Sequence, residues 1–154
     1  MNIFVLHEDP ATAARMACDK HVVKMILETA QMLCTAARVR GCWAPYKQTH
    51  KKHPCTLWAG ESRGNWNWLV RYGLALCGEY TKRYNKTHKS QRVIDYCRYL
   101  EVDFESDEMT PFAQAMPSQY KNDCVVADYR AYYHGEKAGF ATWKTEAPDW
   151  WEIN

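Results

Sequence analysis

Residues 9–41, DPATAARMACDKHVVKMILETAQMLCTAARVRG, decide the fold class of this 154-residue chain. Asp9 offers a side-chain acceptor directly before Pro10, a combination typical of a helix N-terminus. Gly41 follows a long run without proline and is typical of a helix end. The segment therefore predicts helix from Pro10 to about Arg40, with a break near Asp19.

The rest of the chain also has helical periodicity. Further helices are predicted over residues 62–84, from Ser90 to about Leu100, and from Asn122 or Asp123 to about Ala138. Inside the long middle helix, Gly73 and Gly78 predict close packing against a neighbour. Other segments are expected to be a strand or a tied-down terminus (1–8), a connecting loop (41–60) and an irregular loop (111–117). We expect a mostly α protein, a compact single-domain helical bundle of three to five helices with long loops, spanning residues 1–154.

Composition narrows the class of protein. With 47% hydrophobic residues the chain can form a core, and the 14% aromatic content supplies both core and surfaces on which bases could stack. No run of about 18 apolar residues predicts a membrane span, and the N-terminus does not resemble a signal peptide. The 7 cysteines lack paired spacings, which favours free thiols and a cytoplasmic protein.

The sequence from residue 19 to residue 31, DKHVVKMILETAQ, carries the strongest functional signal. His21, Lys24, Glu28 and Gln31 step by three and four residues, so they share one narrow face of a helix. Nearly all their neighbours are apolar, and apolar surroundings shift pKa values towards the working pH of acid–base catalysis. Two interpretations stay open, an acid–base site facing a cleft and a narrow solvent-facing stripe with a Lys24–Glu28 ion pair.

Two other regions combine basic and aromatic residues. Arg83 and Lys86 lie near a basic cluster, where the alternative is an exposed Glu79–Arg83 pair. Residues 128–137, DYRAYYHGEK, place rings beside cations, which suits unpaired bases and phosphates or, alternatively, a core. The spacing of Cys18, His21, His50, His53 and Cys55 is only loosely metal-like, so no metal site is expected.

Three patterns together resemble the phage pyrimidine-dimer DNA glycosylases of the endonuclease V type. The first is a short start leading to His21 and, seven residues later, Glu28. The second is His53-Pro54 before a long helix that ends in EYTKRY, residues 79–84. The third is the aromatic and basic segment 129–137.

The resemblance implies a small, mostly helical repair enzyme that cleaves a glycosidic bond and then the abasic strand, without a metal or other cofactor. It implies a terminal amine as nucleophile and a catalytic glutamate. The expected catalytic set is Met1 or Asn2 as the source of the amine, with Glu28, His21 and Lys24. The expected nucleic-acid-binding set is Gln31, His53, Arg83, Lys86, Tyr129, Arg130, Tyr133 and Lys137. The chain departs from the family at Asn2, where the family has threonine, and at Leu27 and Gln31, where it has arginines.

Three functions therefore stay open. The first is a DNA glycosylase and abasic-site lyase that acts on damaged or modified bases. The second is an enzyme that modifies or hydrolyses nucleotides with His21, Lys24 and Glu28. The third is a non-enzymatic protein that sequesters a nucleotide or binds nucleic acid. In each case the partner is DNA or a nucleotide and not a membrane.

Overall fold

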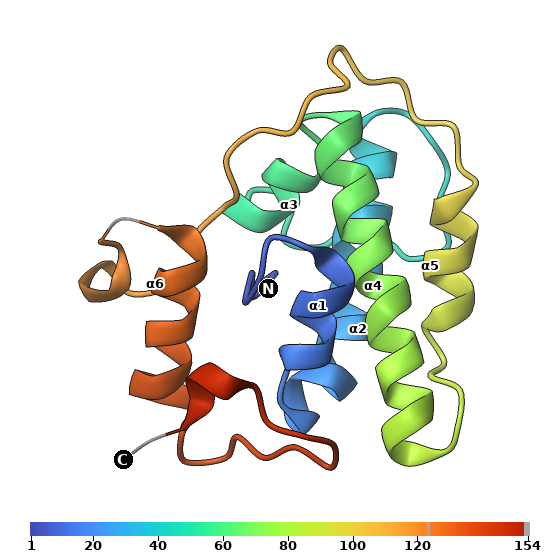
Figure 1. Ribbon diagram of the computed structural model, residues 1–154. Helices are drawn as coiled ribbons and strands as arrows, with labels where there is room; N and C mark the ends of the chain where they lie inside the picture. The colour runs from blue at the N-terminus through green and yellow to red at the C-terminus, as the bar shows by residue number, and fades with distance from the viewer. Residues whose placement is uncertain (123, 153–154) are drawn as a thin grey trace.

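The computed structural model describes residues 1–122 and 124–152. Regular secondary structure in these residues is entirely helical, so the mostly α prediction is confirmed (Figure 1). The α-helices are α1 (Pro10–Met16), α2 (Asp19–Val39), α3 (Pro54–Ala59), α4 (Arg63–Tyr84), α5 (Gln91–Arg98) and α6 (Val125–Tyr132). Shorter turns are η1 (Ser118–Tyr120), η2 (Tyr133–Lys137) and η3 (Asp149–Trp151). Within this part of the chain, none of the helices has the length and apolarity that crossing a bilayer needs.

The first predicted helix is two helices, α1 and α2, with the break where the sequence placed it. Asp9 caps α1 by accepting a hydrogen bond from the Thr12 N–H at 2.9 Å. Ala17 and Cys18 are extended, and α2 begins at Asp19. The break turns the chain so that the N-terminus of α2 meets the C-terminal segment, where the Asp19 N–H donates to the Thr142 carbonyl at 2.8 Å.

Helix α4 is the central element, in contact with α1, α2, α3 and α5. Its buried face includes Trp66, Leu69 and Tyr72. At Gly73, α2 and α5 approach so closely that an added Cβ would lie 2.8 Å from Thr29 Cγ2 and 3.0 Å from Ile94 Cδ1. The close packing predicted at Gly78 is wrong, because nothing lies within 4 Å of a Cβ there.

The first residues form a buried, irregular segment, so the tied-down terminus is the correct one of the two alternatives. Ile3, Val5 and Leu6 are fully buried, and Figure 1 shows this segment between α1 and α6. Phe4 has a φ of 33°, an uncommon backbone conformation for a bulky residue. The start of the chain is thus part of the core.

The predicted loop 41–60 contains an unexpected helix, α3. Proline at its first position suits a helix start, and the His53 side chain caps it by accepting a hydrogen bond from the Cys55 N–H at 3.1 Å. The helix is 6 residues long, too short for helical periodicity to show in the sequence. With it, the described residues contain six α-helices, one more than the upper limit expected.

The C-terminal part follows the prediction with one change in geometry. Helix α6 begins at Val125, and of the two expected starting residues Asp123 lies outside the described residues. The predicted continuation to about Ala138 is present as the π-helix η2. The aromatic tail then returns to α1, where the Trp143 Nε1–H donates to the Met16 carbonyl at 3.0 Å.

The two glycines of α4 provide a matched test of this packing. Gly73→Ala should lower the free energy of unfolding by about 1–2 kcal/mol, because the methyl group overpacks the contact with Thr29. Gly78→Ala should raise it by about 0.5–1 kcal/mol, because alanine favours the helix and meets no neighbour. Urea unfolding of both variants measures the difference, and effects of the same sign would contradict the packing described.

Candidate active site

The centre of the site is an ion pair between the start of the chain and the middle of α2. The Met1 α-amine lies 3.1 Å from Glu28 Oε1. The side chains of Met1 and Glu28 are 4% and 10% exposed. Because Met1 as a whole is half-buried, its exposed part is the backbone that carries the amine, whereas Glu28 is buried. Lys24 Nζ lies 3.7 Å from the other carboxylate oxygen, and its side chain is 72% exposed. An amine and a carboxylate thus meet at the protein surface, with the carboxylate mostly buried.

Asn2 fixes the direction of the terminus. Its side-chain oxygen accepts hydrogen bonds from the N–H groups of Ile3 and Phe4, at 2.8 and 3.1 Å. Its amide nitrogen donates to the Ala115 carbonyl at 2.8 Å. Because Asn2 is itself buried, these bonds hold the backbone that leads to the amine. Asn2 therefore positions the amine and is not exposed to a ligand.

His21 lies one layer further inside. Its ring stacks on Phe4, with centroids 4.1 Å apart, and its Nδ1 shares a 2.6 Å hydrogen bond with the Tyr133 hydroxyl. Burial, followed by the charges of Lys137 and Lys24, lowers the pKa of His21 to about 3. The imidazole is therefore neutral at physiological pH and connects the N-terminal segment to the C-terminal helices.

Two predicted DNA-binding residues border the ion pair. The pKa of His53 is lowered, mainly by its partial burial and then by the positive charge of the terminal amine. Gln31 is half-buried and lines a small pocket with Leu27 and Tyr46. Along this face of α2, His21 and Glu28 are buried and Lys24 is exposed. The residues therefore do not all face solvent, as the solvent-stripe interpretation required.

Other predicted binding residues lie in the interior. The Arg83 side chain is fully buried, with ion pairs to Asp19 at 3.2 Å and Glu79 at 2.9 Å. The Tyr129 side chain is also buried, and its hydroxyl donates to the Ala113 carbonyl at 2.8 Å. Both side chains make their polar contacts inside the protein and are not accessible to a nucleic acid.

The remaining predicted residues are spread over the surface and the C-terminal region. Arg130 is half-buried and donates to the Leu6 carbonyl at 3.0 Å. Tyr133 is fully buried against His21. Lys86 is exposed in the connection between α4 and α5. Of the C-terminal set, Lys137 alone borders the pocket at the start of α2.

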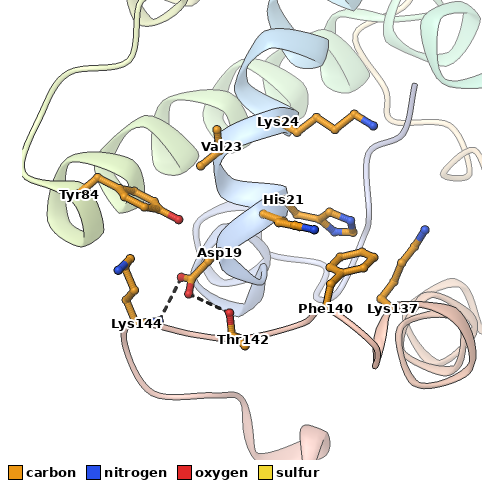
Figure 2. Close-up of a pocket in the computed structure, with 10 residues that line it drawn as sticks. Asp19, His21, Val23, Lys24, Tyr84, Lys137, Phe140, Thr142 and Lys144 are labelled. Carbon is orange, nitrogen blue, oxygen red and sulfur yellow. Dashed lines mark hydrogen bonds between the residues drawn. The ribbon is translucent and has the colours of Figure 1, made fainter.

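This pocket has a volume of about 710 Å³ (Figure 2), and one of its lining residues is Lys24, which lies 3.7 Å from Glu28. Its walls come from the first two turns of α2, the end of α4 and segment 137–144. His21 and Lys24 line it, together with three residues that the sequence did not indicate as site residues, Lys20, Phe140 and Lys144. Lys20 could have been found as the residue four positions before Lys24, but nothing local marks Lys144.

Among residues 1–122 and 124–152, no group of three or more His, Cys, Asp or Glu side chains could hold a metal ion.

A protein-family model described as pyrimidine dimer DNA glycosylase matches residues 1–92. This range contains Met1, Lys24, Glu28 and His53, and it ends before α6. No curated protein and no solved structure matches the chain.

The buried His21 should make the stability of the protein depend on pH. Its pKa is about 3 in the folded protein and near 6.5 in an unfolded chain, so only the unfolded chain gains a proton as the pH falls through this range. Wild type should therefore lose roughly 2–3 kcal/mol more than His21→Gln between pH 7 and pH 4.5. Urea unfolding at both pH values measures this difference, and equal losses would show that His21 does not stay neutral.

Proposed function

Because the chain belongs to the pyrimidine dimer DNA glycosylase family, we propose that it removes a damaged or modified base from DNA and then cleaves the abasic strand. The α-amine of Met1 is the nucleophile, and Glu28 is the carboxylate that assists it. The observation that carries this proposal is the 3.1 Å distance between the amine nitrogen and Glu28 Oε1.

The first step is attack of the amine on C1′ of the sugar. Glu28 lies within hydrogen-bond reach of the amine, so it can accept the proton that an ammonium group must lose before it attacks. The C1′–N bond forms while the glycosidic bond breaks, and the base leaves with the bonding electrons and takes up a proton. The positive charge that develops on the sugar is stabilised by the negative carboxylate nearby.

The second step is cleavage of the strand. Opening of the sugar ring leaves an imine between C1′ and the terminal nitrogen. Loss of a proton from C2′ then expels the phosphate at C3′ by elimination, and Glu28 can shuttle this proton because it faces the same atoms. The products are a strand break and, after water hydrolyses the imine, the free amine.

Lys24 is the alternative amine of the site, and its environment is less suitable. Lysine nucleophiles are activated by desolvation in an apolar pocket or by another cation. The Lys24 side chain is 72% exposed, with Glu28 3.7 Å away. The terminal amine belongs to a half-buried residue and lies nearer to Glu28, at 3.1 Å.

The base that is removed must leave the duplex before C1′ can be reached. Leu27 and Gln31 stand beside Glu28 where the family has arginines. Because these uncharged side chains cannot form the same contacts, we propose damaged or modified bases in general as the substrate class, of which the pyrimidine dimer is one member.

Borohydride trapping on an oligonucleotide with an abasic site tests the amine and the carboxylate together. Reduction of the imine should link the protein covalently to DNA. Glu28→Gln should slow trapping by about 10²–10⁴-fold, the usual range for loss of a positioned acid–base group. Glu136→Gln, an exposed residue with the same change in charge, is the control and should trap at the wild-type rate. Trapping that is equally fast in both variants would contradict the role of Glu28.

Adding one glycine before Met1 distinguishes the terminal amine from Lys24. The extra residue moves the amine by up to about 3.8 Å and away from Glu28, so trapping should fall by at least tenfold. DNA affinity should change little, and intact-mass measurement identifies the terminal residue of each preparation. Peptide mapping of the crosslink to Lys24 would overturn the proposed nucleophile.

A further inference from the structure

The pocket beside the ion pair is bordered by lysines, and nearly all its charges are positive. Lys20 and Lys24 come from α2, and Lys137 and Lys144 come from the C-terminal segment. Asp19 supplies the one carboxylate among its lining residues. Figure 2 shows Lys24 and Lys137 on the side of the pocket near His21, and Lys144 on the opposite side, near Tyr84.

Both carboxylate oxygens of Asp19 have hydrogen-bond partners within the fold. Oδ1 accepts from Arg83 at 3.2 Å and from the Lys144 N–H at 3.0 Å, and Oδ2 accepts from the Thr142 hydroxyl at 3.3 Å. Because Arg83 is shared with Glu79, it offsets the charge of Asp19 only in part. The four lysines still outnumber this carboxylate among the residues that line the pocket.

Three of the lysine ammonium groups lie over aromatic rings. Lys20 Nζ lies 4.9 Å from the centroid of Phe140, Lys137 Nζ 4.7 Å from that of Tyr132, and Lys144 Nζ 5.4 Å from that of Tyr84. Within residues 1–122 and 124–152, no ion pair involves any of these three lysines. Cation–π contacts at such sites are weak, so the ammonium groups can turn towards an anion at little cost.

The π-helix η2 is what brings Lys137 to the pocket. π-Helical turns are rare and are frequently found at functional sites. At Gly135 in this turn, an added Cβ would overlap the hydroxyl end of the half-buried Tyr120 side chain, so η1 and η2 are in close contact there. This contact supports the turn that carries Lys137.

The pocket lies on one side of the catalytic pair. Lys20, Lys24 and Glu28 are four residues apart on α2, so each lies about 6 Å further along the same face. On the other side of Glu28, the exposed Leu27 and the half-buried Gln31 carry no charge, and Lys47 is the one lysine among the described residues of the pocket that they line. A polyanion that reaches Glu28 therefore meets more positive charge on the side of the four lysines.

We infer that this pocket is a subsite for one phosphodiester group of the DNA strand, adjacent to the nucleotide whose C1′ lies at Met1. The inference rests on the proposed function for its location and on the lysines for its ligand chemistry. Lys20, Lys137 and Lys144 bind the phosphate oxygens, and the subsite fixes the polarity of the strand, because the phosphate on the other side of the nucleotide meets the weaker positive charge of Lys47 alone.

Phosphate interference tests the subsite directly. The probe is a duplex with a stable tetrahydrofuran abasic analogue and a neutral methylphosphonate at one backbone position at a time. The proteins are wild type, the double variant Lys137→Gln/Lys144→Gln, and the control Lys89→Gln/Lys121→Gln, which removes the same charge at exposed positions outside the pocket. Affinity is measured by fluorescence anisotropy, and circular dichroism verifies that each variant is folded.

Methylphosphonate at one phosphate beside the abasic analogue, on one side only, should weaken binding of wild type and the control by about tenfold. In the pocket variant this sensitivity should vanish, and the slope of log affinity against log salt should fall by about 1–2. On a natural abasic site, the pocket variant should raise KM and leave kcat within about twofold. Retained sensitivity in the pocket variant, or its equal loss in the control, would overturn the subsite.

The two proposals fail in different ways. If wild type forms no borohydride crosslink but shows the one-sided interference, the lysine subsite is retained and the amine chemistry is wrong. If wild type forms the crosslink and interference is the same on both sides or absent, the chemistry is retained and the subsite is wrong. An absence of both signals contradicts both.

Discussion

The ion pair between the Met1 amine and the Glu28 carboxylate is the constraint on which the rest of the structure depends. The Glu28 carboxylate is largely shielded from water, and a shielded charge is costly unless its partner remains in place. The partner here is the end of a chain, which would fray if it were not anchored. The anchoring comes from the hydrogen bonds of Asn2 and from full burial of Ile3. Burial of the first residues in the core is therefore what holds the terminal amine beside Glu28.

A second buried cluster of charged groups lies around Arg83, and its role is structural. Arg83 donates to the backbone carbonyl of Ala17 at 2.7 Å and pairs with Asp19 and Glu79. It thereby joins the end of α4 to the break between α1 and α2, a place where backbone groups would otherwise lack partners. Charge at this end of the molecule is thus of two kinds: fixed charge that completes the fold, and the exposed lysine charge that surrounds the pocket.

The sequence was sufficient for most helices and for the placement of His21 and Glu28 on one helix, because both depend on local rules. Caps such as Asp9 act over three residues, and the spacing of His21 and Glu28 follows from the helix alone. Long-range contacts decided the rest. Arg83 and Tyr129 have the same side chains whether they face DNA or the core, and their burial depends on Asp19 and Ala113, which are distant in sequence. Lys144 joins the pocket through a segment with no periodicity at all.

The residues proposed for chemistry and those proposed for phosphate binding come partly from different parts of the chain. The residues shared with the glycosylase family, 1–92, contain both members of the ion pair. One wall of the lysine pocket, residues 137–144, lies beyond them. Under the proposed function, chemistry requires an amine and a carboxylate at one fixed distance, which tolerates little change. Phosphate binding requires only positive charge within reach, which different segments can supply. Lys137 and Lys144 can supply this charge from beyond the matched residues, whereas Leu27 and Gln31 beside Glu28 supply none.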